Sequence, residues 1–247
     1  MVICMMKWRA LPHQQLHVRR DDMACDYTLT RSKRKTLALY VRDGTIEVRA
    51  PLKMSQSEID KFIATKEKWI ANKLAQSLIN MEQRKAFVLD YGDMILYRGK
   101  RYPIAVKEGN RIGFDDTVFY MPPNLPSEEI KAVCVQIYRL LARRDLTNKT
   151  IDFAKIMNVP PSQVKISGAK TSWGSCSNKK SINFSWRLIM ADDDVINYVV
   201  VHELAHLIEM NHSERFWAIV EGVLPDYQER QKRLKELQRK LSCEDWE

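Results

Sequence analysis

The feature that most constrains the fold is an apolar run near the C-terminal end, from Val195 to Ile208, that contains two histidines and a glutamate. A helix that is apolar on nearly every side is buried in a protein core. His202, Glu203 and His206 would therefore be buried with it, and burying such groups without partners is costly. The run predicts a buried helix whose polar side chains share a partner.

The spacing of these three residues indicates what that partner is. Each residue of a helix turns by about 100°, so His206 returns to within about 40° of His202, one turn along. Both imidazoles can then reach one zinc ion at about 2.0–2.1 Å. Glu203 would flank the ion and accept a proton from a metal-bound water, as in the H-E-x-x-H arrangement of zinc hydrolases. The alternative is that both histidines only satisfy backbone carbonyls in a core.

A third ligand is needed, and His212 is the best candidate. It follows the motif by six residues, just after Asn211, where we expect the helix to end in a left-handed turn. Metzincins have the same histidine spacing, with a glycine where this chain has Glu209. Glu209 itself, Glu221 and Asp226 are alternative ligands. Three protein ligands leave the fourth zinc position open for water.

Composition excludes several classes of protein. The chain has 247 residues, of which 45% are apolar and 29% are charged, which is ordinary for a soluble globular protein. No apolar run reaches the ~18 residues of a membrane helix. The N-terminal residues lack the charge order of a signal peptide, and the five cysteines are an odd number with no C-x-x-C pair. We therefore expect a cytoplasmic protein with reduced thiols and no membrane partner.

The net charge of +9 bears on partners. Basic residues cluster at 31–35, 98–101 and 139–144. Such clusters raise the chance of a nucleotide or nucleic-acid partner, but a solvated surface is the preferred explanation because no nucleic-acid motif accompanies them.

The order of elements predicts an α+β fold. We expect a loose extension over 1–25, a β-rich part with one helix over 26–120, and a helical catalytic domain over 121–247. Asp43-Gly44 lies between two alternating segments and predicts a hairpin. Ser57 can cap the helix of the β-rich part.

Two further segments bear on the organisation of the second half. A long helix is expected from Ser127 to about Met157, before Pro160-Pro161. The strand "SINFSW" (181–186) can be an edge strand that holds an extended peptide beside the metal, with Trp173 to Cys176 as the turn next to it. A purely structural turn with core aromatics is the alternative.

Several motifs together resemble a known family. The stretches "TSWGSC", "INFSWRLI" and "YVVVHELAHLIEMNHSERFW" are similar to those of the YgjP-like metal-dependent hydrolases, relatives of the SprT-like and Wss1-like zinc proteases. The similarity covers roughly residues 26–241. It implies a zincin-like catalytic domain with zinc on His202, His206 and His212, Glu203 as the acid and base, and an N-terminal β-rich part packed against it. Nucleotide pyrophosphohydrolase activity has also been attributed to YgjP-like members.

The sequence thus favours a zinc-dependent metallopeptidase that acts on peptides or proteins. In this hypothesis a zinc-bound water, activated by Glu203, attacks a peptide carbonyl. One alternative is a metal-dependent nucleotide pyrophosphohydrolase, which would hold phosphates without a Walker-type glycine loop. The other is a nucleic-acid-associated protein with a structural zinc.

Overall fold

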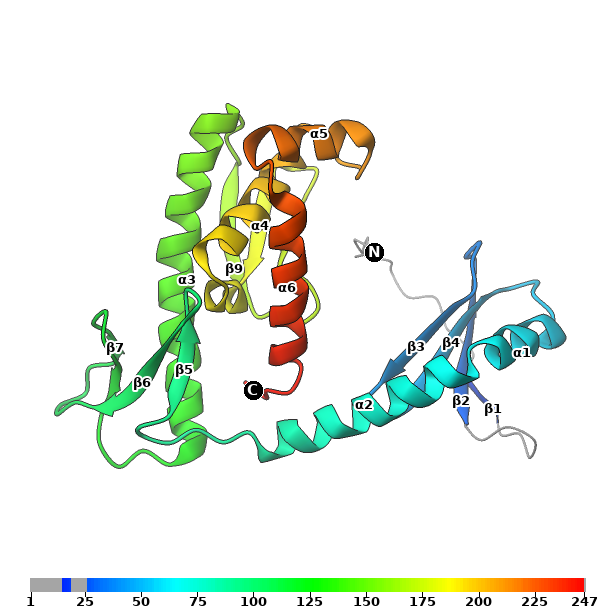
Figure 1. The fold of residues 1–247 in the computed structure, drawn as a ribbon, viewed down its shortest axis with the longest axis horizontal. Coiled ribbons are helices and arrows are strands. Elements are labelled where there is room, and N and C mark those ends of the chain that lie inside the picture. Colours follow the sequence, from blue (N-terminus) through cyan, green and yellow to red (C-terminus); the bar gives the residue numbers. More distant parts are fainter. Residues whose placement is uncertain (1–14, 19–25, 247) are drawn as a thin grey trace. The chain divides into compact units, whose positions relative to one another are not determined.

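The structure is a computed structural model that describes residues 15–18 and 26–246 (Figure 1). The chain divides into two compact units. One contains the described residues up to Phe87 together with Ser242–Glu244, and the other contains Val88–Leu241 together with residues 245 and 246. Both units combine helices with β-sheet, so the predicted α+β class and the β-rich N-terminal part are confirmed.

The first unit is a four-stranded sheet with two helices. Its elements are β1 (Gln15–Val18), β2 (Tyr27–Ser32), β3 (Ala38–Arg42), β4 (Thr45–Pro51), α1 (Gln56–Thr65) and α2 (Glu67–Ala86), and the strand order is β1-β2-β4-β3. Asp43 and Gly44 both have positive φ and connect β3 to β4, as the hairpin prediction requires. Strand β1 lies inside the segment expected to be loose and pairs antiparallel with β2. Residues 1–14 and 19–25 of that segment lie outside the described residues.

Local signals fix the helices of this unit. Helix α1 begins two residues earlier than expected because Ser55, not Ser57, is its N-cap. The Ser55 hydroxyl accepts from the Glu58 amide while the Glu58 carboxylate accepts from the Ser55 amide, at 2.8 Å. Buried Ile59 and Ile63 then belong to the same core as the inward side chains of β4, such as Val48. Alternation on β4 and the spacing of the isoleucines on α1 produce one shared apolar core.

The second unit contains two sheets and the remaining helices. Its elements are β5 (Met94–Tyr97), β6 (Lys100–Val106), β7 (Gly113–Phe114), β8 (Phe119–Met121), α3 (Ser127–Met157), β9 (Gln163–Ser167), β10 (Gly174–Cys176), β11 (Ser181–Ser185), a 3-10 turn over Trp186–Met190, α4 (Asp193–Ala205), α5 (Glu214–Val223) and α6 (Tyr227–Leu241). The strand orders are β5-β6-β8-β7 and β10-β11-β9. Helix α3 ends at Met157 as expected, with Asn158 in the left-handed conformation.

The structure groups strands β5–β8 with the helices that follow them, whereas the sequence suggested one β-rich part over 26–120. The reason lies in long-range packing onto α3. The Tyr138 ring lies 5.3 Å from that of Phe119, and its hydroxyl donates to the Leu96 carbonyl at 2.7 Å. These contacts join residues 19 and 42 positions apart, which local sequence patterns do not encode.

Helix α4 is the buried centre of the second unit. It contacts α3, α5, α6 and β10 (Figure 1). Its buried residues include Val195, Val199 and Leu204, which confirms the prediction from the apolar run. Asp192 caps the helix by accepting from the Val195 amide at 3.2 Å. Among the described residues, no helix has the combination of length and apolar character that a membrane span requires.

The tip of the β5–β6 hairpin anchors the start of α4. The Arg98 amide donates to the Ile189 carbonyl at 2.7 Å, and the Arg98 guanidinium donates to Asp193 at 2.8 Å. Gly99 has φ +77, and a Cβ there would lie 2.8 Å from the Cβ of Asp192. The hairpin can approach the cap of α4 this closely only because residue 99 has no side chain.

We expect Gly99→Ala to destabilise the protein by about 1–3 kcal/mol more than Gly109→Ala. Both glycines have positive φ, so both substitutions strain the backbone, but a Cβ at Gly109 meets nothing within 4 Å. Urea unfolding followed by tryptophan fluorescence measures the difference. Equal destabilisation by the two substitutions would show that the contact with Asp192 does not restrict the hairpin.

Candidate metal centre

Two of the predicted site residues lie on α4 and a third lies just beyond it. His202 and Glu203 are in the last turn, and His206 is the C-cap residue with helical φ and ψ of −65° and −16°. The one-turn spacing is therefore kept, and the His202 and His206 ring centroids lie 5.0 Å apart.

The helix ends at Ala205 and not near Asn211. Turn-type hydrogen bonds follow it, from the Leu207 amide to the Leu204 carbonyl at 2.9 Å and from the Ile208 amide to the Ala205 carbonyl at 3.0 Å. Asn211 does not have positive φ. The chain reverses through this turn, so the left-handed residue that we expected is not required.

The turn brings His212 back to the end of α4. Its Nε2 lies 3.1 Å from the Nε2 of His202, and its ring centroid lies 4.7 Å from that of His206. One potential ligand nitrogen from each of the three histidines lies within 4.8 Å of the others. Nitrogens bound to one tetrahedral zinc lie roughly 3.3 Å apart, so the three rings need only small adjustments to share an ion.

Neighbouring groups orient the imidazoles. The Nδ1 of His206 donates to the Glu209 carbonyl at 3.2 Å, which leaves its Nε2 unprotonated for a ligand. Phe216 is fully buried, and its ring centroid lies 4.9, 4.6 and 4.7 Å from those of His202, His206 and His212. Its helix, α5, is capped by the Ser213 hydroxyl, which accepts from the Phe216 amide. Sequence reasoning treated Phe216 only as an apolar position of a helix.

Electrostatics favour the ligand form of all three imidazoles. The pKa of His202 is lowered to about 3, mainly by burial and then by His206 and His212. Burial also lowers the pKa of His206 and of His212. The rings are therefore neutral near pH 7, and neutral imidazole is the form that binds a metal.

Glu203 is a buried carboxyl group beside the triad. Only 5% of its surface is exposed, and burial raises its pKa to about 8. Its Oε2 is buried without a hydrogen-bond partner among the described residues. A buried polar atom of this kind points to a partner that the polypeptide does not supply.

Strand β10 lies directly over this carboxyl group. A Cβ on Gly174 would lie 2.6 Å from both Cγ and Oε1 of Glu203. No side chain fits between the strand and the acid, so glycine is required there. The sequence offered a signal for this in "SWGSC", but its partner Glu203 is 29 residues further along the chain.

The segment that the sequence suggested as an edge strand is not at the edge of its sheet. Strand β11, which contains most of "SINFSW", is the central strand of its sheet, with β9 parallel on one side and β10 antiparallel on the other. The edge beside the metal centre is β10, in the segment expected to be a turn. The error arose because apolar alternation reveals a strand but not its neighbours in the sheet.

None of the three alternative acidic ligands belongs to the histidine group. Asp226 forms an ion pair with Arg230 at 2.9 Å, and a Glu209 carboxylate oxygen accepts from the Asn211 amide at 3.4 Å. Glu221 is exposed on α5 and, like the other two, is not part of the histidine group.

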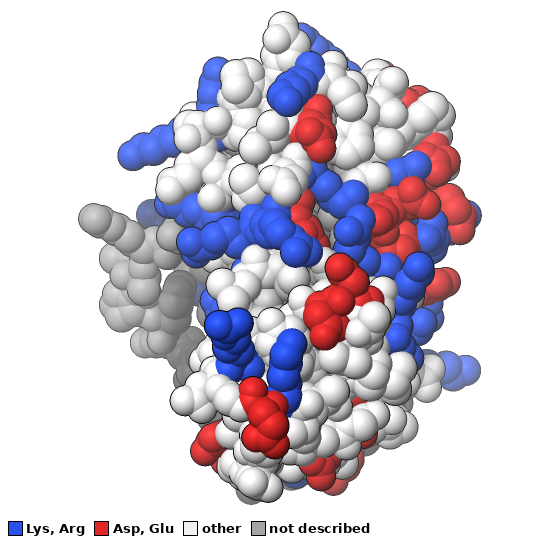
Figure 2. Space-filling view, turned by 90° about the vertical axis from the view of Figure 1, so that its left-hand side faces the viewer, with Lys and Arg blue, Asp and Glu red and all other residues white. Residues whose placement is uncertain are grey.

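The basic clusters do not form an isolated cationic surface. Arg98 pairs with Asp193, and Arg144 pairs with Asp145 at 2.7 Å. Figure 2 shows a face on which Lys and Arg side chains form a band, with Asp and Glu side chains beside it. A solvated surface with mixed charges accounts for this arrangement.

Comparison with known proteins identifies relatives. The model of the YgjP-like family, described as a metallopeptidase domain, matches residues 35–237 and confirms the resemblance seen in the sequence. No curated protein matches significantly. Two solved structures are similar to 37% of the chain. They are the metallopeptidase zymogens abylysin of Pyrococcus abyssi (25% identity, 92% of that chain, TM-score 0.35) and jannalysin of Methanocaldococcus jannaschii (19% identity, 95% of that chain, TM-score 0.34).

The histidine geometry predicts that zinc stabilises the protein. At a free Zn²⁺ concentration of 100 times Kd, we expect about 2.7 kcal/mol of added stability, seen as a higher Tm than in the metal-free protein. His206→Ala should remove this zinc-dependent shift, whereas Glu221→Gln, in the exposed alternative ligand, should retain it. If His206→Ala shows the full zinc-dependent rise in Tm, His206 is not a zinc ligand.

Proposed function

The chain belongs to the YgjP-like metallopeptidase family, and we propose that it is a zinc-dependent peptidase whose metal is held by His202, His206 and His212. The observation that supports this proposal most strongly is the convergence of three imidazole nitrogens next to a buried carboxyl group.

The donor set fits zinc. Three neutral imidazoles provide nitrogen ligands, whereas Ca²⁺ and Mg²⁺ require oxygen ligands. When bound, zinc would acidify a coordinated water and polarise the carbonyl of the scissile peptide bond.

Glu203 is suited to move the proton. It follows His202 directly in the chain, and its Oε2 has no hydrogen-bond partner among the described residues. Burial alone would keep this carboxyl group protonated near pH 7, and a Zn²⁺ bound beside it would favour the ionised form. In the proposed reaction this oxygen then takes the proton that the attacking water loses and delivers it to the nitrogen of the leaving amine. The cover provided by β10 keeps the carboxyl group in a fixed position and away from bulk water.

The outer edge of β10 is suited to hold the peptide. The Ser185 amide donates to the Trp173 carbonyl at 2.9 Å and the Ser177 amide donates to the Ser181 carbonyl at 3.0 Å. In an antiparallel pair these contacts alternate, so the backbone groups of Gly174 and Cys176 are directed away from β11. A substrate strand that pairs with them would pass next to Glu203.

Glu203→Gln tests the role of the carboxyl group. The amide is similar in size but cannot take up the proton, so we expect peptide cleavage to fall by about 10²–10⁴-fold. The zinc content and the zinc-dependent rise in Tm should remain, because Glu203 is not a proposed ligand. Cleavage at an undiminished rate would remove this residue from the mechanism.

Gly174→Ala tests the contact between β10 and Glu203. The added Cβ overlaps the buried carboxyl group, so either the strand or the acid must move. Displacement of about 1 Å can cost about 10²-fold, and we expect kcat/KM to fall by that order. Gly222→Ala is the control, since a Cβ there meets nothing within 4 Å. If both variants keep wild-type kcat/KM, the close approach of β10 has no catalytic consequence.

A further inference from the structure

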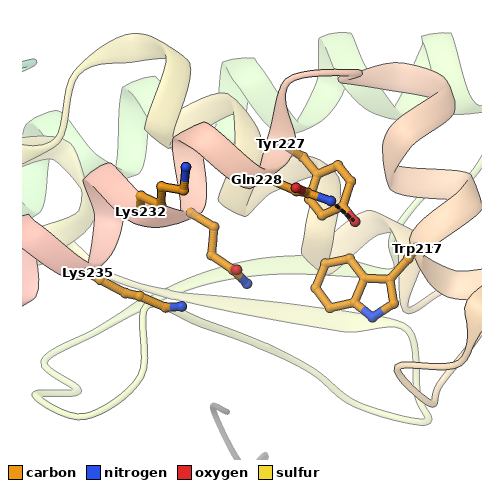
Figure 3. Close-up of a pocket in the computed structure, with 6 residues that line it drawn as sticks. Trp217, Tyr227, Gln228, Lys232 and Lys235 are labelled. Atoms are coloured by element: carbon orange, nitrogen blue, oxygen red, sulfur yellow. Dashed lines mark hydrogen bonds between the residues drawn. The ribbon is translucent and has the colours of Figure 1, made fainter.

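A groove next to the metal centre has no role in the proposed chemistry so far. It lies between α5 and α6 and encloses a volume of about 330 Å³ (Figure 3). Its lining consists of two aromatic residues, two amides and two lysines, namely Trp217, Tyr227, Gln228, Gln231, Lys232 and Lys235.

The groove is in direct contact with the histidines. The Trp217 ring stacks on His212, with centroids 5.7 Å apart and an angle of 27° between the planes. Gln231 donates to the Tyr198 hydroxyl at 3.3 Å, and the Tyr198 ring lies 5.9 Å from that of His202. If a peptide is bound at the three histidines, the residues next to its cleaved bond would therefore reach the groove.

The groove is cationic and contains no acid. Helix α6 carries two acidic residues and six basic ones, Arg230, Lys232, Arg233, Lys235, Arg239 and Lys240. Arg230 and Arg233 form ion pairs with aspartates.

The two lysines of the groove have fewer acidic partners than Arg230 and Arg233. Lys232 pairs only with exposed Glu229, at 3.3 Å, and Lys235 has no ion pair within the described part of the chain. In Figure 3, Trp217 and Tyr227 lie at one end of the groove and the two lysines lie at the other.

We propose that this groove binds an acidic side chain of the substrate, so that the enzyme prefers peptides with Asp or Glu close to the cleaved bond. This inference rests on the proposed peptidase function and specifies its substrate class. A carboxylate accepts hydrogen bonds from the Lys232 and Lys235 ammonium groups, and the apolar part of its side chain packs against Trp217.

The aromatic residues fit this occupant better than a nucleotide. Trp217 and Tyr227 stack on each other, with centroids 5.3 Å apart and planes at 18°. This contact covers one face of each ring, which reduces the aromatic surface on which a nucleobase could stack. Lysines also act as point charges, whereas planar, bidentate recognition of phosphate favours arginine.

Cleavage of matched peptides tests the preference. Pairs of internally quenched peptides would differ only by Glu or Gln at one position within three residues of the cleaved bond. For the zinc-loaded wild-type protein, we expect kcat/KM to be about fivefold higher for the best Glu peptide, as for a partly exposed ion pair. Lys235→Gln combined with Lys232→Gln should lower the ratio of kcat/KM for the Glu peptide to kcat/KM for the Gln peptide to about one. Arg239→Gln combined with Lys240→Gln removes two positive charges from the same helix outside the groove, and should keep the preference.

Binding provides a second measurement that does not depend on turnover. Fluorescence anisotropy with zinc-loaded Glu203→Gln protein and labelled peptides should show the same fivefold difference in Kd, and the two lysine substitutions should remove it. Equal cleavage and equal binding of the Glu and Gln peptides would overturn the inference and leave the peptidase proposal intact.

The remaining outcomes separate the two proposals. If the wild-type protein cleaves neither peptide, the proposed function fails, and anisotropy still decides what the groove prefers. If a nucleoside triphosphate displaces the Glu peptide and is hydrolysed, the groove is a phosphate site and the inference is overturned.

Discussion

Burial of polar side chains on α4 is the constraint on which the rest of this structure depends. The helix packs against α3, α5, α6 and β10 and most of its residues are buried, so the polar groups on its buried part need hydrogen-bond or ligand partners. Its start is held by the Asp192 cap and by Arg98 of the β5–β6 hairpin. Its last turn carries a carboxyl group and imidazoles that the protein core only partly satisfies. The fold therefore maintains an unsatisfied polar site at one end of its most buried helix.

The three histidines are positioned as a set rather than one by one. The Phe216 ring lies within 5 Å of all three imidazole centroids, and the Glu209 carbonyl fixes the orientation of His206. Because the Ser213 cap sets the start of α5, the position of the ring depends on where that helix begins. The turn after α4 and the first turn of α5 thus act together on the site.

Local patterns in the sequence predicted those features that depend on neighbouring residues. The buried helix, the one-turn spacing of His202 and His206 and the Asp43-Gly44 hairpin follow from side-chain periodicity and turn chemistry. The central place of β11 and the grouping of β5–β8 with α3 depend on pairing between distant segments, so they could not be predicted in this way. The contact of Gly174 with Glu203 belongs to the same class.

The contact between Gly174 and Glu203 also links the position of the β10 edge to the position of the buried carboxyl group. The backbone atoms available at the edge of β10 and the carboxyl group beneath it touch through a residue with no side chain. A shift of the strand to accommodate a different ligand would therefore move the carboxyl group, and a bulkier side chain at residue 203 would displace the strand. In the proposed peptidase, a change in the peptides that β10 accepts would therefore also change the reaction rate, which narrows the evolutionary routes open to the chain.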